Sequence, residues 1–93
     1  MEFQIVVHIN QRSFRMQVKR IYLSESIERF EVKGGNRSII FKNNRPLLKT
    51  TNSRKKPLWQ IEEGAEPIPP HTFALIVLAI EKKIKEYEAP GSN

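Results

Sequence analysis

Apolar and polar residues alternate along the first part of the chain, the period-two pattern of strands with one buried face. In residues 3–9 the inward positions are Phe3, Ile5, Val7 and Ile9. Residues 14–19 repeat the alternation with Phe14, Met16 and Val18. The polar residues 10–13 between them are typical of a turn. The pattern therefore predicts an antiparallel hairpin formed by residues 3–9 and 14–19.

A second hairpin is predicted around Gly34-Gly35-Asn36, because Gly and Asn tolerate the positive φ that tight hairpin turns need. Its strands are residues 27–33 and 37–42, and their inward positions are Phe30, Val32, Ile39 and Phe41. The polar and basic residues 49–56 are expected to form a mobile loop. A further short strand is predicted at 58–62.

Residues 72–88 have the spacing of an amphipathic helix, with Thr72 as the expected N-cap after a proline pair. Its sheet-facing stripe contains Phe73, Ile76, Val77, Ile80, Ile84 and Tyr87. The preceding segment 63–70 contains three prolines and is expected to be a stiff linker. The predicted fold class is α+β, with an antiparallel sheet of about five strands (two hairpins plus a short strand) packed on one C-terminal helix.

The length of 93 residues allows one domain, which we expect to span residues 1–88, with a flexible tail at 89–93. The chain has no cysteine, which excludes disulfides, cysteine-based zinc sites and thiol nucleophiles. Its first residues lack the features of a secretory signal, and the longest apolar run, at 73–80, is too short to span a membrane. We therefore expect a soluble, cytoplasmic protein without a membrane partner.

Positive charge is concentrated in the middle third of the chain. The formal net charge is +6, and all ten acids are glutamates. None of them lies between Val32 and Ile61, although that stretch carries eight lysines and arginines. The other eight basic residues stand against ten glutamates, so the rest of the chain has a net charge of −2. A chain polarised in this way attracts anionic partners.

Strand parity places part of this charge on the face of the sheet opposite the helix. The outward basic positions are Arg15, Lys19, Arg29, Lys33 and Lys42, accompanied by Gln17 and Gln60, with Glu31 as the main opposing charge. The neighbouring loop adds Arg45, Lys49, Arg54, Lys55 and Lys56. Such a surface suits a phosphate backbone. The alternative is that these side chains only keep an exposed sheet face soluble.

Motifs for catalysis or metal binding are lacking. His8 and His71 are the only histidines, and no residues have the paired spacing of metal ligands. The serines have no partnering His–acid pattern, and the glutamates at 62–66 are interpreted as solvated linker residues. Gly34-Gly35 joins two strands and does not open a helix, so it is not a phosphate loop. We expect a protein that is not an enzyme and needs no cofactor or metal.

The first two turns of the predicted helix are apolar nearly all round, because Leu75 and Leu78 lie away from the sheet-facing stripe. These two apolar side chains are expected to be shielded from water by another part of the structure. One candidate is the loop around Leu47 and Leu48, and the other is a second copy of the chain. Leu75 and Leu78 are therefore candidate interface residues.

Two resemblances accompany these patterns. The order of four or five antiparallel strands and one helix is similar to that of PUR-repeat and Whirly-type domains, which bind single strands; this likeness concerns the fold alone. The chain also resembles a family of short bacterial proteins in the residues Asn43-Asn44-Arg45-Pro46-Leu47-Leu48, Pro57-Leu58-Trp59-Gln60-Ile61-Glu62 and Gly64. That resemblance implies no activity, because none is attached to the family.

The sequence thus predicts a small non-enzymatic binding domain. The favoured function is binding of nucleic acid or another polyanion through the basic sheet face and residues 33–56. The aromatic residues of the strands fall on inward positions, so contacts are expected through charge and not through base stacking. The alternative function is protein–protein interaction or homodimerisation through the apolar helix 72–88.

Overall fold

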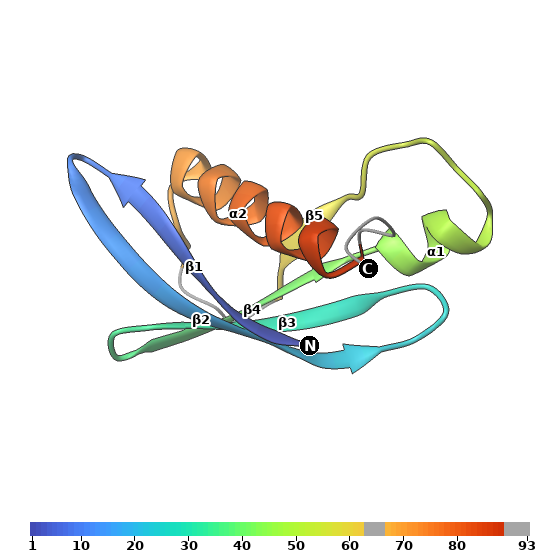
Figure 1. Cartoon of the computed structure of the whole chain (residues 1–93), viewed down its shortest axis with the longest axis horizontal. Helices are drawn as coiled ribbons and strands as arrows, with labels where there is room; N and C mark the ends of the chain where they lie inside the picture. Colours follow the sequence, from blue (N-terminus) through green and yellow to red (C-terminus); the bar gives the residue numbers. More distant parts are fainter. Residues whose placement is uncertain (63–66, 89–93) are drawn as a thin grey trace.

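The computed structural model describes residues 1–62 and 67–88. Five antiparallel strands form one sheet in chain order, namely β1 (Glu2–Ile9), β2 (Arg12–Leu23), β3 (Glu28–Gly34), β4 (Arg37–Asn43) and β5 (Trp59–Ile61). A short helix α1 (Arg45–Thr50) follows β4, and the long helix α2 (Pro70–Glu88) comes after β5. Figure 1 shows α2 crossing one face of the sheet. The predicted α+β class is confirmed.

Two tight turns connect the predicted hairpins. Asn10 and Gln11 both have positive φ, 49° and 66°, as the central residues of a type I′ turn do. In the second hairpin Gly35 has a φ of 61°, which glycine adopts without strain. Strand β2 is longer than predicted, because it continues to Leu23 along β3 past an irregularity between Arg20 and Tyr22.

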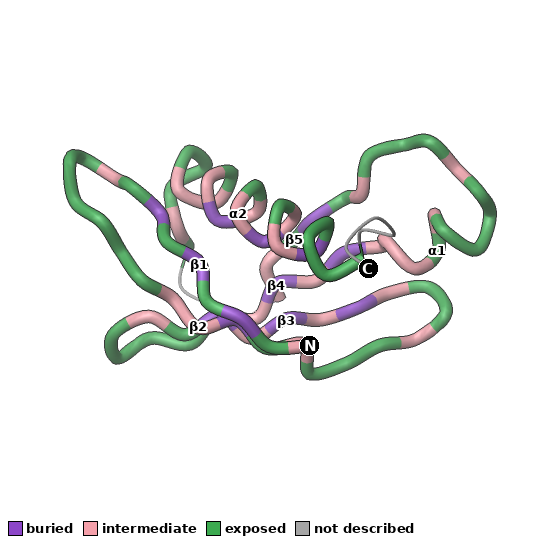
Figure 2. Tube along the Cα trace, in the orientation of Figure 1, coloured by how far each residue is buried: buried purple, intermediate pink, exposed green. Residues whose placement is uncertain are grey.

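The core lies between α2 and the sheet face beneath it, which we call the inner face. Its buried apolar residues are Phe3, Ile5, Val7, Val18, Phe30, Val32, Phe41, Trp59, Ile76, Ile80 and Ile84. Figure 2 shows these buried stretches on the strands beneath α2, whereas the connection from α1 to β5 is mostly exposed. The inward parity predicted for the strands is confirmed, although Phe14 stays 40% exposed on the inner face.

Helix α1 was not predicted from the sequence, and helix α2 begins earlier than predicted. Residues Arg45–Thr50 form α1, so the mobile loop expected at 49–56 was wrong for its first part. Pro46 lies in the first turn of α1, where its missing N–H leaves no hydrogen bond unmade. Helix α2 starts at Pro70, and Phe73 N donates to Pro69 O, so Thr72 lies within the first turn and is not the N-cap.

The expected cover of Leu75 and Leu78 by the loop around Leu47 and Leu48 is wrong. Helix α1 lies beside the last turn of α2, where Lys49 Nζ is 2.9 Å from Glu88 Oε1. Leu78 lies ten residues earlier, about 15 Å along the helix axis at 1.5 Å per residue. Its side chain is 61% exposed, whereas Leu75 is half-buried against the core.

Some expectations fall outside the described residues. The tail expected at 89–93 and the first part of the linker, 63–66, are among these. Within the two described ranges, no helix is long and apolar enough to cross a membrane.

Candidate anion-binding site

A cluster of charged side chains fills one end of the space between the sheet and α2. We call it the ionic cluster, and its members are Arg20, Glu28, Arg45, Lys49 and Glu88. Glu28 is fully buried, because its position on β3 faces inward and α1 lies over it. Arg45 donates from Nε and Nη2 to both carboxylate oxygens of Glu28, with Nη2 at 2.9 Å from Oε2. Arg20 Nη1 lies 3.6 Å from the same carboxylate.

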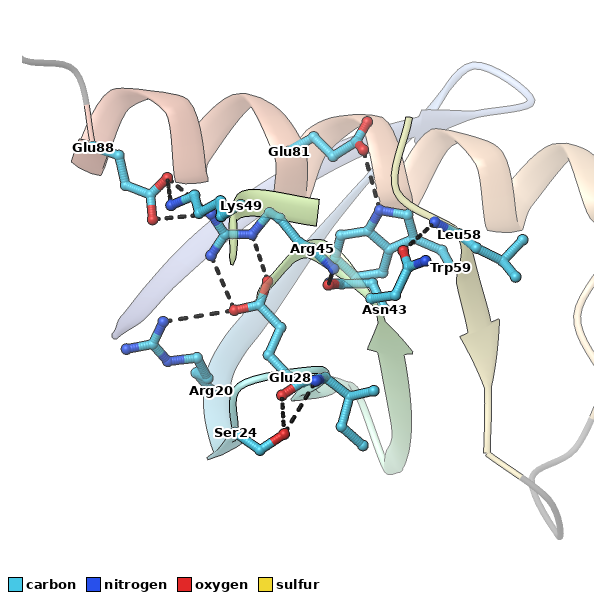
Figure 3. Close-up of polar contacts among 12 residues, drawn as sticks. Arg20, Ser24, Glu28, Asn43, Arg45, Lys49, Leu58, Trp59, Glu81 and Glu88 are labelled. Carbon is cyan, nitrogen blue, oxygen red and sulfur yellow. Dashed lines mark hydrogen bonds and ion pairs between the residues drawn. The ribbon is translucent and has the colours of Figure 1, made fainter. Parts of the chain in front are cut away.

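Arg45 links this buried carboxylate to the last residue of α2. Its Nη1 donates to Glu88 Oε1 at 2.8 Å and to Oε2 at 2.9 Å, and Lys49 Nζ donates to Glu88 Oε1. Figure 3 shows the Arg45 guanidinium held between the two carboxylates. Strand β3, helix α1 and helix α2 are therefore joined through the Arg45 side chain, and Arg20 on β2 joins them through Glu28.

Two members of the ionic cluster, Arg45 and Glu88, have pKa values shifted in the direction that favours their charged forms. Partial burial lowers the pKa of Arg45, but hydrogen bonds and charge from Glu28 and Glu88 outweigh it and leave that pKa above its ordinary value. Partial burial likewise raises the pKa of Glu88, but hydrogen bonds from Lys49 and Arg45 outweigh it and leave the pKa below its ordinary value. Both groups are thus held in their ionised forms.

Two asparagines at the end of β4 position α1 and the following segment. Arg45 N donates to Asn43 Oδ1 at 2.7 Å, which ties the first residue of α1 to the sheet. Leu58 N donates to Asn44 Oδ1 at 2.8 Å, which ties the start of β5 to the start of α1. The segment 51–57 therefore leaves and returns at nearly the same point. Asn43 Nδ2 is buried and has no hydrogen-bond partner among the described residues.

This segment and α1 enclose a hollow of about 340 Å³, which we call the basic pocket. It is lined by Arg45, Leu48, Lys49, Asn52, Ser53, Lys55 and Pro57. The backbone of the pocket is ordered by Ser53 N, which donates to Leu48 O at 2.8 Å, and by Asn52, which adopts a φ of 55°. No acid occurs among the described residues that line the pocket, although Arg45 and Lys49 both pair with Glu88 beside it. Lys55, the Asn52 amide and the Ser53 hydroxyl are groups that can hold a phosphate oxygen.

The ten predicted anion-binding residues fall on two separate surfaces. The strand positions Arg15, Lys19, Arg29, Lys33 and Lys42 share the face turned away from α2, which we call the open face. The register puts Lys33 opposite Gln17, and Lys42 opposite both Arg29 and Gln60. The remaining five, Arg45, Lys49, Arg54, Lys55 and Lys56, belong to α1 and the segment after it, on the α2 side.

Acids partly neutralise the open face. Lys19 lies opposite Glu31, whose carboxylate is also 3.7 Å from Lys33 Nζ. Arg29 forms an ion pair with Glu62 and stacks on the ring of Tyr22 at 4.7 Å. In the predicted loop, by contrast, Arg54, Lys55 and Lys56 are exposed and have no acid beside them in the chain. The positive potential is therefore expected to be strongest around the basic pocket.

The ionic cluster was missed by the sequence reading, although strand parity carried a clue to it. Glu28 lies two residues before Phe30 on the same inward row, and Asn43 lies two residues after Phe41 on the next strand. Polar residues in a row of core positions indicate a buried polar site. What covers them could not be read from that row, because Glu88 is 60 positions away in the chain from Glu28.

No grouping of three or more metal-ligating side chains occurs within residues 1–62 and 67–88. His8 lies on the open face, and its Nδ1 is 2.9 Å from Ser13 Oγ. His71 is exposed in the first turn of α2.

Comparison of the chain with models of protein families, with curated proteins and with solved structures gave no match. The two resemblances drawn from the sequence therefore stay predictions, and the function has to be argued from the site itself.

Proposed function

We propose that the protein binds the phosphate backbone of a nucleic acid, with the basic pocket and its neighbouring cations as the main contact. The observation that supports this most directly is the lining of the pocket. Lys55 faces a hollow that also offers the Asn52 amide and the Ser53 hydroxyl, and no acid occurs among the described residues that line it. A phosphate group needs this combination of cations and neutral hydrogen-bond donors.

In this proposal Arg45 does not contact the phosphates, although its positive charge would suit that role. Its guanidinium already donates to Glu28 and Glu88, and its side chain is only 13% exposed. It is therefore a positioning residue that holds α1 against the sheet. Arg54, Lys55 and Lys56 remain as the main residues that contact the phosphates, and Lys49, whose Nζ already lies 2.9 Å from Glu88 Oε1, contributes less.

The open face contributes less in this proposal. Its cations alternate with Glu31 and Glu62, so a phosphate passing over them meets repulsion as well as attraction. It also lies on the opposite side of the sheet from the basic pocket, so one stretch of backbone cannot contact both without passing around the border of the sheet. Its main effect is to raise the local concentration of the nucleic acid.

Fluorescence anisotropy with labelled single-stranded DNA, single-stranded RNA and duplex DNA tests the proposal. Affinity is expected to fall as salt rises, because each neutralised phosphate releases condensed counterions. An absence of binding at low salt, or binding that does not respond to salt, would contradict it. Equal competition by heparin, a sulfated polysaccharide, would show that the site reads charge density and not a nucleic acid.

Two charge-matched triple variants distinguish the surfaces. Replacing Arg54, Lys55 and Lys56 by glutamine is expected to reduce the slope of log affinity against log salt by about 2 for single strands, at roughly 0.7 per phosphate contact. Replacing Lys19, Lys33 and Lys42 by glutamine removes the same charge from the open face and is expected to change the slope by less. A larger change in slope for the open-face variant would instead indicate that the phosphates contact the open face.

A second candidate function is homodimerisation through α2, because Leu78 is 61% exposed on the outer side of that helix. Light scattering after size exclusion tests it across a wide concentration range. A dimer that Leu78→Lys converts to a monomer would support this function. If the wild-type protein is a monomer at every concentration, homodimerisation is excluded.

A further inference from the structure

The two edge strands of the sheet differ in length. Strand β5 has three residues, whereas β1 has eight, and no strand of the described residues pairs with the outer edge of β1. Proteins commonly protect such an edge with proline, lysine or a bulge, because its exposed backbone groups recruit other chains. Strand β1 contains neither proline nor lysine, and its register with β2 is regular from end to end. Its outer edge is therefore suited to pairing with a further strand.

The outer edge of β1 presents backbone groups of its even-numbered residues. Arg20 N donates to Met1 O at 2.9 Å, and this bond fixes the alternation of the antiparallel ladder. The odd-numbered residues of β1 therefore bond to β2, and the even-numbered ones turn their N–H and C=O groups outward. Tyr87 on α2 agrees with this direction, because its hydroxyl donates to Glu2 O at 3.0 Å. The next outward groups along the edge belong to Gln4, Val6 and His8.

A groove of about 540 Å³ lies between this edge and the later turns of α2. We call it the edge groove. Three consecutive residues of β1 line it, namely Gln4, Ile5 and Val6, and Ala79 lines it from α2. Neighbouring side chains of a strand point to opposite faces, so three consecutive residues share one groove only along the strand edge. Figure 1 shows β1 at the border of the sheet, beside α2. An extended chain in this groove would reach the outward backbone groups of β1.

The described residues that line the edge groove carry more positive than negative charge. Lys82 and Lys83 line it from α2, and Arg15 lines it from the open-face side, opposite Val6. Glu86 is the one acid among these described residues, and its Oε2 lies 3.7 Å from Lys83 Nζ. Lys82 and Arg15 are exposed. A carboxylate that enters the groove therefore meets net attraction.

These charges distinguish between two occupants of the edge. A second copy could pair its β1 with this β1 about a twofold axis near Ile5. Lys82 and Lys83 line the groove beside Ile5, so those of the two copies would then meet across the axis and repel each other. We propose instead that the edge groove binds an extended acidic peptide of a partner protein. The peptide adds a strand to the sheet through the outward groups of β1, and one of its carboxylates lies toward Lys82.

Amide hydrogen exchange, followed by NMR on the full chain, tests the backbone pairing. The probe is a short peptide of alternating valine and threonine around two central glutamates. The amides of Gln4 and Val6 are expected to exchange at least about tenfold more slowly with saturating peptide, because each then donates to the added strand. The amides of Ile5 and Val7, which already bond to β2, should change little.

Two outcomes of that measurement would overturn the proposal. One is peptide binding, or its absence at millimolar peptide, without slower exchange at Gln4 and Val6. The other is slow exchange of these amides in the free protein together with a dimer in light scattering, which would mean that a second copy occupies the edge.

The charge preference is tested with two matched variants of α2. Lys82→Glu reverses a charge that lines the groove, whereas Lys85→Glu makes the same change on the same helix outside it. Lys82→Glu is expected to weaken the glutamate peptide about tenfold and to strengthen a peptide with lysines in place of the glutamates. Lys85→Glu should leave both affinities within about twofold. Equal effects of the two substitutions would show a response to net charge alone and would contradict the proposal.

The role of the strand edge is tested at Val6, whose N–H points outward. Proline is tolerated on an edge strand where its missing N–H would face solvent. Val6→Pro is therefore expected to abolish peptide binding, whereas Val6→Thr, which keeps the N–H, should leave the affinity within about twofold. Unchanged binding by a folded Val6→Pro variant would overturn the proposal. If that variant does not fold, Lys82→Glu with the two peptides still decides the question.

This site is independent of the proposed nucleic-acid contact, because the edge groove and the basic pocket share no lining residue. The variant with glutamine at Arg54, Lys55 and Lys56 separates the two experimentally. It is expected to lose affinity for nucleic acid and to bind the glutamate peptide within about twofold of the wild type. If it loses the peptide as well, the peptide binds at the basic pocket and the edge-groove proposal fails.

Discussion

The two ends of the space beneath α2 share strands β2 and β3 but are built in opposite ways. At one end β3 places Gly34 on the inner face, and a mostly apolar hollow of about 370 Å³ lies between the strands and the first turns of α2. At the other end the same strand places Glu28 on the inner face, and Arg45 closes over it. An inward position on a strand thus specifies only which way the side chain points. Whether the residue there leaves a hollow or forms a buried ion pair depends on the element that packs over it.

This difference has an energetic consequence. A hollow lined by apolar groups loses packing contacts, but it leaves no polar group without a partner. A buried ion pair can be nearly neutral for stability while it is intact, yet removing one partner is costly, because the remaining charge stays in a poorly solvated place. The ionic end should therefore be the more sensitive to substitution.

The largest effect is expected from Glu28→Ala. The loss in the free energy of unfolding should be about 3–5 kcal/mol, because Arg45 and Arg20 would lose the carboxylate that compensates them. Urea unfolding followed by circular dichroism measures it. Glu31→Ala is the control on the same strand, and on the open face it should cost less than about 1 kcal/mol. Equal losses at the two positions would contradict the comparison.

A paired replacement sharpens the interpretation of that loss. Glu28→Leu combined with Arg45→Met removes both charges and keeps most of the volume. It should recover at least about 2 kcal/mol of the loss seen in Glu28→Ala, because the mostly buried charge of Arg45 is no longer left without its carboxylate, whereas Arg20 and Glu88 are more exposed to solvent. Recovery in urea unfolding would mean that the pair specifies where α1 docks and adds little net stability. A double variant no more stable than Glu28→Ala would show that the pair itself is stabilising.

A smaller effect is expected at the hollow end, from two adjacent glycines. Gly35→Ala should cost about 1–2 kcal/mol, because its φ of 61° places a Cβ against the backbone. Gly34→Ala should change the free energy of unfolding by less than about 0.5 kcal/mol, because its Cβ meets only the flexible side chain of Met16. Thermal unfolding of the two variants compares them directly. A larger cost at Gly34 would mean that the hollow is more tightly packed than its volume indicates.

The smallest effect is expected from Glu88→Gln, and it depends on pH. The pKa of Glu88 is lowered in the folded protein, so its contribution is fully present above the unfolded pKa of about 4.3 and is lost as pH falls through the folded pKa. Because the side chain is 35% exposed, solvent screening keeps this contribution below about 1 kcal/mol. Unfolding measured from pH 7 to pH 3 should show the wild type losing its advantage over Glu88→Gln below pH 4.3. A constant difference would contradict the role of its charge.

The strands and α2 could be predicted because burial on one face leaves a local period in the sequence. The turns at Asn10-Gln11 and Gly34-Gly35 were recognisable for a similar reason, since few residues adopt positive φ cheaply. Helix α1 could not be predicted in this way. Six residues are too few to form a stable helix alone, and this helix depends on ion pairs from Arg45 and Lys49 to Glu28 and Glu88.

The candidate site was predicted in part. Parity correctly grouped Arg15, Lys19 and Lys33 on one face, because alternate residues of neighbouring strands point the same way. It could not show that Arg45 and Lys49 lie on the other side of the sheet. Their position depends on the direction in which the chain leaves β4, which the hydrogen bonds of Asn43 and Asn44 set.

The sequence by itself determined the five-stranded sheet, the face that α2 covers and the excess of positive charge in the middle of the chain. Each of these follows from residues that are close in the sequence. Only the tertiary structure decided that this charge divides between two surfaces, that Arg45 is held by two carboxylates, and that one end of the layer under α2 is hollow. Those outcomes depend on contacts such as that between Arg45 and Glu88, which are 43 residues apart, and a local pattern carries no information about such pairs.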